Sequence, residues 1–159
     1  MLKILKKYTV LMLLLLGVAT QAQLTTYPSL VAGYTYQNQS FGELGARLIM
    51  LNNDDVVYRA SATAMMGSTQ GEFTVMPKVQ ADVLLNFQKN VDIFHSWYFL
   101  AGVETTSKYF SPKVGFSLFG ILDVTGGYAF SYGSLLHGKE LKGFNFNLGL
   151  SIPLVFFAK

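Results

Sequence analysis

The feature that most constrains this chain is an alternation of side-chain character with a period of two residues, which returns in eight separate segments. Between residues 73 and 87, one parity carries mainly Phe, Val, Ala and Leu, while the other carries Thr74, Lys78, Gln80 and Asp82. Successive side chains of a β-strand point to opposite faces, so this pattern predicts a strand with one apolar and one polar face. The other seven segments span 30–37, 43–50, 56–66, 97–104, 113–118, 122–131 and 144–154.

The connections between these segments carry turn chemistry. Gly, Asn, Asp, Gln and Ser gather at 37–40, 52–55, 67–71 and 133–143, and the tightest connection is 119–121. With the N-terminus in the periplasm, the turns at 52–55 and 119–121 face the periplasm and the longest connection faces outside. The expected fold class is therefore all-β, a closed antiparallel up-and-down transmembrane β-barrel of about eight strands.

The polar face of the segments holds their charges together with most of their glycines. Turning an Arg or Lys toward mid-membrane lipid costs about 2–4 kcal/mol, so the charged face is expected to line the lumen and the apolar face to meet lipid. Glycine on the same face suits a narrow interior. The glycines are Gly33, Gly45, Gly102, Gly115, Gly127 and Gly149. We predict a lumen ion network of Glu43, Arg47, Arg59, Lys78, Asp82, Glu104, Lys113 and Asp123.

Two further residue types bear on this barrel. Aromatic residues lie on the apolar parity, several of them near segment ends, where an interfacial girdle is expected. Pro77 and Pro153 fall inside predicted strands, and proline cannot donate to a ladder that has no free edge. Both are interpreted as bulges, with a break in the strand as the alternative at Pro77.

The first 22 residues read as a signal peptide and residues 23–159 as the barrel domain. Three lysines precede an uncharged run at 8–18 that is too short for a membrane helix, and small residues follow up to Ala22. The whole chain has a formal charge of +3, which these three lysines account for, so the remainder is neutral. Its net charge therefore does not indicate nucleic acid or anionic lipid as a partner. The chain has no cysteine, which excludes disulfides and thiolate metal sites.

With its alternating strands and export signal, the chain resembles the small OmpA/OmpX-type outer-membrane barrels over residues 23–159. Its end is similar to their assembly signal at Asn147, Gly149, Ile152 and Leu154, although the terminal aromatic is displaced. The resemblance implies the bacterial outer membrane as location, outer-membrane lipid as surroundings and the barrel-assembly machinery as a partner during biogenesis. The Gln-Ala-Gln around residue 22 is similar to export signals of the Bacteroidota.

Chemistry in such a barrel would depend on two histidines. His95 precedes Ser96, and His137 lies three residues before Glu140, but the His-x-Ser spacing of outer-membrane deacylases is absent. A charged lumen also leaves no room for an acyl chain, so no enzyme is expected. Neither histidine has a second ligand at metal spacing, and no cofactor or nucleic-acid motif is present.

Four functional readings remain. The first is a structural, adhesive or surface-binding barrel with a charged, plugged lumen, whose loops at 105–111 and 132–142 contact an unidentified extracellular partner. The second is a narrow channel gated by the ion network. The third is an outer-membrane lipid-modifying enzyme, and the fourth is a soluble periplasmic lipocalin-like binding barrel with the apolar face inside.

Overall fold

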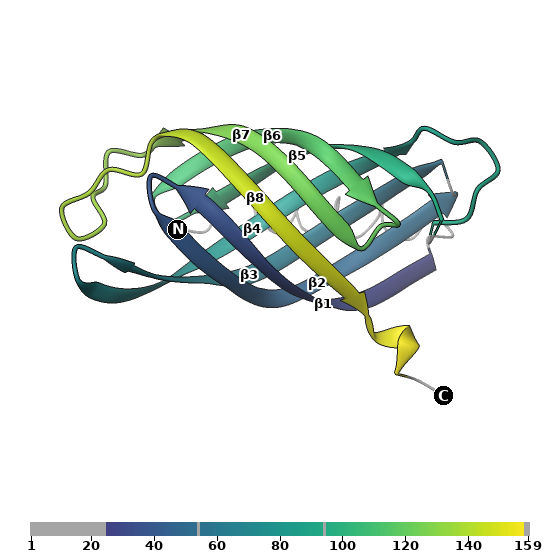
Figure 1. The fold of residues 1–159 in the computed structure, drawn as a ribbon, viewed down its shortest axis with the longest axis horizontal. Helices are drawn as coiled ribbons and strands as arrows, with labels where there is room; N and C mark the ends of the chain where they lie inside the picture. The colour runs from purple at the N-terminus through teal and green to yellow at the C-terminus, as the bar shows by residue number, and fades with distance from the viewer. Residues whose placement is uncertain (1–24, 54, 94, 158–159) are drawn as a thin grey trace, which may run out of the picture.

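The computed structural model describes residues 25–53, 55–93 and 95–157, which form one closed antiparallel barrel (Figure 1). Each strand pairs with the next along the chain, and β8 pairs with β1. The expected all-β antiparallel barrel of eight strands is confirmed, whereas the signal-peptide interpretation of residues 1–22 lies outside the described residues. The elements are β1 (Thr25–Gln37), β2 (Ser40–Asn53), β3 (Val56–Thr69), β4 (Glu72–Asn86), β5 (Trp97–Thr106), β6 (Tyr109–Leu118), β7 (Leu122–Ser131), β8 (Gly143–Pro153) and the 3-10 turn η1 (Leu154–Phe156).

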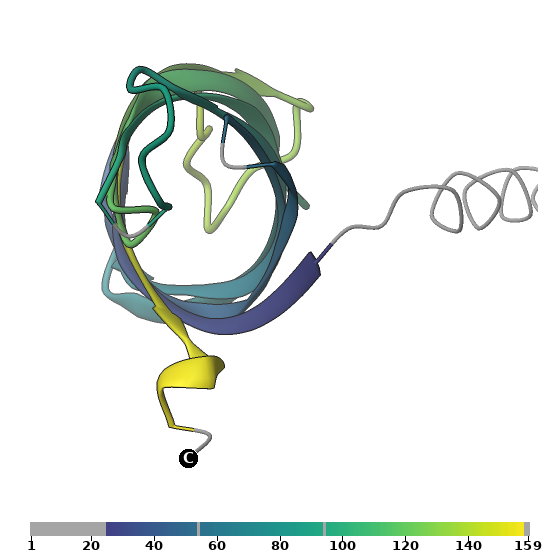
Figure 2. The same cartoon turned by 90° about the vertical axis from the view of Figure 1, so that its right-hand side faces the viewer.

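The two ends of the barrel differ in their connections. The long-loop end, on the left of Figure 1, holds the turns 38–39, 70–71 and 107–108 and the loop 132–142. The other end, on the right, holds the connections between β2 and β3, β4 and β5, and β6 and β7; because β1 begins and β8 ends there, it is called the termini end. Figure 2 shows the ring of strands from the termini end. Among the described residues, no helix is long and apolar enough to cross a bilayer.

The connections correct one expectation from the sequence. Residues 105–111 are not a loop, because β5 and β6 leave only a two-residue turn there. The loop 87–96, at the termini end, is nearly as long as 132–142. The tight connection at 119–121 is as expected: Phe119 and Gly120 have φ of 58° and 64°, and the Ile121 amide donates to the Leu118 carbonyl at 3.0 Å. Two residues with positive φ define the type I′ turn that suits strand twist.

The prolines do not sit at bulges or breaks, so both interpretations were wrong. Pro77 pairs in register with Ala64 of β3, and the pairing of β4 with β5 begins one residue later, at Lys78. At Pro77, β4 is therefore paired with β3 but not with β5, so the sheet tolerates the missing amide donor. Pro153 pairs in register with Ser29 and is the last residue of β8, where the strand gives way to η1.

A third proline escaped the sequence reasoning altogether. Pro112 lies inside β6, and the ladder between β6 and β7 skips from Phe110 to Lys113 without a change of register. The skipped stretch is the position at which β6 lacks an amide donor. The irregularity that does shift the register lies elsewhere, between Leu51 and Asn53 at the end of β2.

The strands turn their apolar residues outward and their polar residues inward. Leu44, Val79 and Val114 are each more than half exposed, whereas Arg59, Lys78 and nearly all other charged strand side chains are buried. This is the reverse of a water-soluble protein, in which charged residues are almost never buried unpaired and apolar ones fill the interior. The lumen is the polar compartment of this fold.

The inward glycines are fixed by close packing between neighbouring strands. A Cβ on Gly45 would lie 2.2 Å from the carbonyl oxygen of Ala62, and one on Gly102 would lie 2.3 Å from a carboxylate oxygen of Asp82. Gly102 pairs with Asp82 on one side and with Lys113 on the other. Glycine therefore provides the space in which charged side chains of adjacent strands enter the narrow lumen.

We expect Gly45→Ala to lower the free energy of unfolding by about 1–3 kcal/mol, because its new methyl group meets backbone that cannot move aside cheaply. Gly42→Ala, in the same strand, is the matched control, since the nearest atom to its Cβ would be 3.9 Å away. Its effect should stay within about 1 kcal/mol. Urea unfolding followed by Trp97 fluorescence measures both. Equal losses in the two variants would contradict the packing argument.

Candidate functional site

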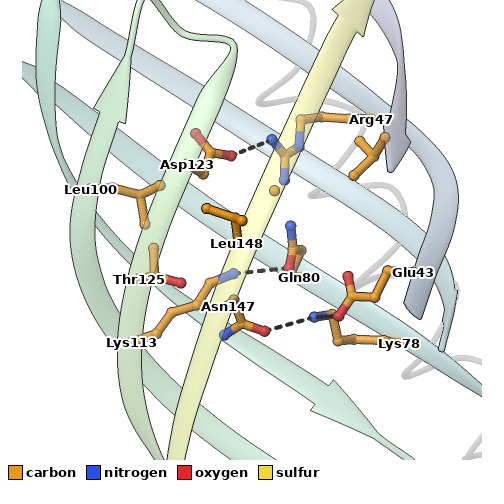
Figure 3. A pocket seen from close by; sticks show the side chains of 12 residues that line it. Glu43, Arg47, Lys78, Gln80, Leu100, Lys113, Asp123, Thr125, Asn147 and Leu148 are labelled. Atoms are coloured by element: carbon orange, nitrogen blue, oxygen red, sulfur yellow. Dashed lines mark hydrogen bonds and ion pairs between the residues drawn. The ribbon is translucent and has the colours of Figure 1, made fainter. Parts of the chain in front are cut away.

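The structure brings all eight predicted network residues together inside the lumen. Figure 3 shows Glu43, Arg47, Lys78, Lys113 and Asp123 among them. They come from β2 to β7, and each side chain is less than one tenth exposed. Four are basic and four are acidic, so the buried charges balance. Burying ions is tolerated only when each is paired and hydrogen-bonded, and here every one has a partner of opposite sign.

The half of the network nearer the termini end is built on two arginines and two aspartates. Arg47 Nη1 lies 2.6 Å from Asp123 Oδ2, and Arg59 Nη2 lies 3.0 Å from the same oxygen. Arg59 also reaches Asp82 at 3.3 Å. Arg47 crosses the lumen from β2 to β7, and its Nε donates to Ser61 at 2.7 Å. The two guanidinium groups thus connect β2 and β3 with β4 and β7.

The other half is built on two lysines and two glutamates. Lys113 Nζ lies 3.4 Å from Asp82 and 3.5 Å from Glu104, and it donates to Gln80 at 2.9 Å. Lys78 lies 3.3 Å from Glu104 and pairs closely with Glu43. Read from end to end, the charges alternate in sign in one unbroken chain. The order is Glu43, Lys78, Glu104, Lys113, Asp82, the two arginines and Asp123.

Neutral polar side chains complete this network. Thr35 and Asn147 surround the ammonium group of Lys78, each accepting from it at 3.3 Å. Asn145 donates to Glu104 at 3.1 Å. The space left among these groups is a cavity of about 20 Å³, which has room for roughly one water molecule. The middle of the lumen is therefore filled by side chains.

Apolar layers lie on both sides of the network, which the sequence reasoning did not anticipate. The layer at the termini end, the termini cap, includes Leu100 on the inward face of β5 and Ile93 from the loop 87–96. Its members are Ile49, Val57, Leu84, Ile93, Tyr98 and Leu100. The layer at the other end, the long-loop cap, comprises Phe41, Met65, Met76, Tyr109, Ala129, Leu136 and Leu141. The sequence signal that could have revealed the two caps is the presence of apolar residues at inward positions near the strand ends.

The loop 132–142 folds back over the mouth at the long-loop end. Leu136 and Lys139 exchange backbone hydrogen bonds of 2.8 and 2.9 Å around His137 and Gly138, whose φ values of 47° and 82° make a type I′ turn. Asn38, in the turn between β1 and β2, donates to the carbonyl of residue 142 at 2.8 Å and accepts from Lys139 Nζ at 2.7 Å. The loop is thus a small hairpin pinned across the opening.

The tip of this hairpin forms a polar cluster that the sequence did not reveal. His137 Nε2 lies 2.8 Å from Thr74 Oγ1, and its Nδ1 lies 2.7 Å from Glu72 Oε2. Both partners belong to β4, and Glu140, the acid nearest to His137 in sequence, is not one of these two contacts. No sequence spacing could have found the cluster, because 63 residues separate Thr74 from His137.

The second histidine makes no comparable arrangement. His95 is 77% exposed and lies 3.8 Å from Asp92, three residues away. Ser96 Oγ donates to the carbonyls of Val91 and Asp92, each at 2.9 Å, so its hydroxyl stabilises the loop 87–96. Within the described residues, no group of three His, Cys, Asp or Glu side chains could hold a metal ion.

Comparisons of the whole chain with protein-family models, with curated proteins and with solved structures gave no match. What the chain does is therefore argued from its own geometry.

We expect Lys78→Met to lower the free energy of unfolding by about 3–5 kcal/mol, because it leaves Glu43 and Glu104 buried without their shared cation. Adding Glu43→Gln should restore part of the loss, because Glu43 loses the cation that pairs with it, whereas Glu104 keeps Lys113 at 3.5 Å. Lys89→Met, at an exposed loop position, is the control and should change stability by less than about 0.5 kcal/mol. Urea unfolding measures these variants together with Glu43→Gln alone. If the double variant loses as much stability as the two single variants added together, the two residues are not coupled.

Proposed function

We propose that the chain is a bacterial outer-membrane β-barrel with a structural, adhesive or surface-binding role and a plugged lumen. The observation that carries the proposal is the inside-out distribution of side chains. Among the described strands, Glu72 at the start of β4 is the one charged residue whose side chain is not buried in the lumen. A surface of this kind is stable against hydrocarbon, where outward charges are expensive.

The dimensions of the strands support the same placement. A tilted transmembrane β-strand needs about 9–11 residues to cross the hydrocarbon core. The shortest strands, β5, β6 and β7, have 10 residues each, and the longest, β4, has 15. Every strand is therefore long enough to span a bilayer.

Outward aromatic residues gather near both ends of the strands, as interfacial girdles do. Near the termini end, the rings of Phe87, Phe99 and Phe116 lie within 6.5 Å of one another, and Trp97 is half exposed. Near the long-loop end, further exposed rings lie on four strands or just beyond them. They are Tyr34, Tyr36, Phe73, Phe130, Tyr132 and Phe144.

The alternative of a soluble lipocalin-like barrel fits these features poorly. Such a barrel keeps its apolar face inside to hold a ligand, whereas here the middle of the interior is ionic and has a cavity of only about 20 Å³. Its outer surface in water would hold a large continuous area of Leu, Val and Phe side chains. Monomeric soluble proteins rarely expose apolar patches of more than a few hundred Å².

A plugged lumen is favoured over a gated channel by the two apolar caps. Ions crossing the barrel would have to pass both caps as well as the paired charges between them. Loosening one ion pair leaves both caps in place. The proposed role therefore lies in the outer surface and the long-loop end, with outer-membrane lipid and the barrel-assembly machinery as the partners that this location implies.

Location is tested by fractionating cells that express the full chain. We expect the protein in the outer-membrane fraction, with a folded form that migrates differently on a gel before and after boiling. A folded barrel recovered in the soluble periplasmic fraction would overturn the proposal.

A single outward substitution tests the lipid-facing surface directly. Val114 is 56% exposed and pairs with Ala101 and Gly126, the middle residues of β5 and β7. If this surface meets lipid, Val114→Arg should lower the free energy of unfolding from vesicles by about 2–4 kcal/mol. In water, the same change at an exposed position should cost less than about 0.5 kcal/mol. Gln88→Arg, in the exposed part of the loop 87–96, is the control for added charge.

Planar-bilayer recordings separate the plugged barrel from the channel. We expect no unitary conductance at neutral pH, either in the wild-type protein or in Asp82→Asn, because both apolar caps remain. Discrete openings that appear only when Asp82 is neutralised would favour the channel.

A further inference from the structure

We propose that Thr74, His137 and Glu72 form an acyl-transfer site for short-chain carboxylic esters at the mouth of the barrel. This revises the expectation that neither histidine takes part in chemistry, and it does not depend on where the barrel resides. The three residues supply a hydroxyl nucleophile, a base and a carboxylate that positions the base, the combination by which such nucleophiles are activated.

The contacts have the order that this chemistry needs. A carboxylate can only accept, so Glu72 Oε2, at 2.7 Å, fixes the proton of neutral His137 on Nδ1. Nε2 is then free to accept from the Thr74 hydroxyl, which lies 2.8 Å away. Glu72 and Thr74 are two residues apart on β4 and therefore point to the same side of the strand.

Fastening the loop does not by itself account for this cluster. The hairpin is already held by Asn38, by Lys139 and by burial of Leu136 and Leu141 in the long-loop cap. The type I′ turn accounts for the φ of 47° at His137 and places the imidazole at the tip of the hairpin, where it meets Thr74 and Glu72.

The reaction is a two-step transfer. The Thr74 oxygen attacks the ester carbonyl carbon while its proton passes to His137 Nε2. The ester C–O bond then breaks, and the leaving alcohol takes that proton, which leaves an acyl group on Thr74. Water, deprotonated by the same nitrogen, releases the carboxylic acid and restores the hydroxyl. Glu72 stays ionised throughout and stabilises the imidazolium that forms in each step.

The surroundings limit the substrate. Thr74 is only 8% exposed, while the His137 side chain is 34% exposed, so the hydroxyl is approached from the rim. Below the rim, Met76 and Leu136 fill the lumen as part of the long-loop cap. An acetyl or butyryl group fits this approach, whereas a long acyl chain would have to displace the cap.

The test uses the purified full chain in detergent micelles with p-nitrophenyl acetate and p-nitrophenyl octanoate as probes. Hydrolysis is followed by absorbance, and the acylated residue is located by peptide mass spectrometry. The variants are Thr74→Ser, Thr74→Val, His137→Gln and Glu72→Gln. Thr105→Val is the matched control, because its hydroxyl makes a 2.7 Å contact with Tyr132 at the same end but has no base. Heat-modifiability gels confirm that each variant folds.

The proposal expects an acetyl group on Thr74 of the wild type and of Thr74→Ser, and none at position 74 of Thr74→Val or His137→Gln. The kcat of those two variants should fall at least about a hundredfold. Glu72→Gln should lower kcat with little change in KM, and Thr105→Val should match the wild type. The wild type should hydrolyse p-nitrophenyl acetate faster than p-nitrophenyl octanoate.

Two results would overturn the proposal. One is the absence of an acyl group at position 74 in both folded wild type and folded Thr74→Ser, which would leave the cluster as a fastening of the loop only. The other is hydrolysis by Thr74→Val at the wild-type rate, which would place any reaction elsewhere.

Discussion

The structure depends on charges that are buried in the lumen and have to be paired there. An ion without a partner in such a place costs several kcal/mol, which is a large part of the net stability of a protein. The chain meets this requirement with alternating signs, so that Lys78, Lys113 and Asp82 each bridge two or more opposite charges. Because these contacts join strands from β2 to β7 across the lumen, the charges are paired only when those strands surround a common interior.

The same constraint explains the architecture around the network. Charges that point inward leave the alternate positions of every strand apolar and outward, which is the basis of the proposed membrane placement. They also crowd the lumen, so glycine stands opposite charged residues, as Gly102 does between Asp82 and Lys113. The apolar caps then close the polar compartment at each end. The resulting interior is filled, which leaves the rim as the place where we propose chemistry.

Much of this could be predicted from residue parity, and the failures have identifiable causes. The eight network residues were found because charge at alternate positions is a strong local signal. Pro77 was misread because a ladder that ends early on one side cannot be recognised in a single strand. The turn at 107–108 was taken as a longer loop because the alternation alone did not show how far β5 and β6 extend toward each other. The cluster at His137 depends on a contact between segments distant in sequence.

By itself, the sequence determined the strands, their inward and outward faces and the set of charges that share the interior. The reason is that successive side chains of a strand point to opposite faces, so the face of each residue follows from its position alone. Only the tertiary structure decided which acidic residue pairs with which basic one and how the apolar caps close the lumen. It also decided that the hairpin brings His137 into contact with Thr74 and Glu72. These depend on the stagger of one strand against the next and on the path of a loop across the ring. Neither quantity is expressed in any local pattern, since both arise from closure of the whole barrel.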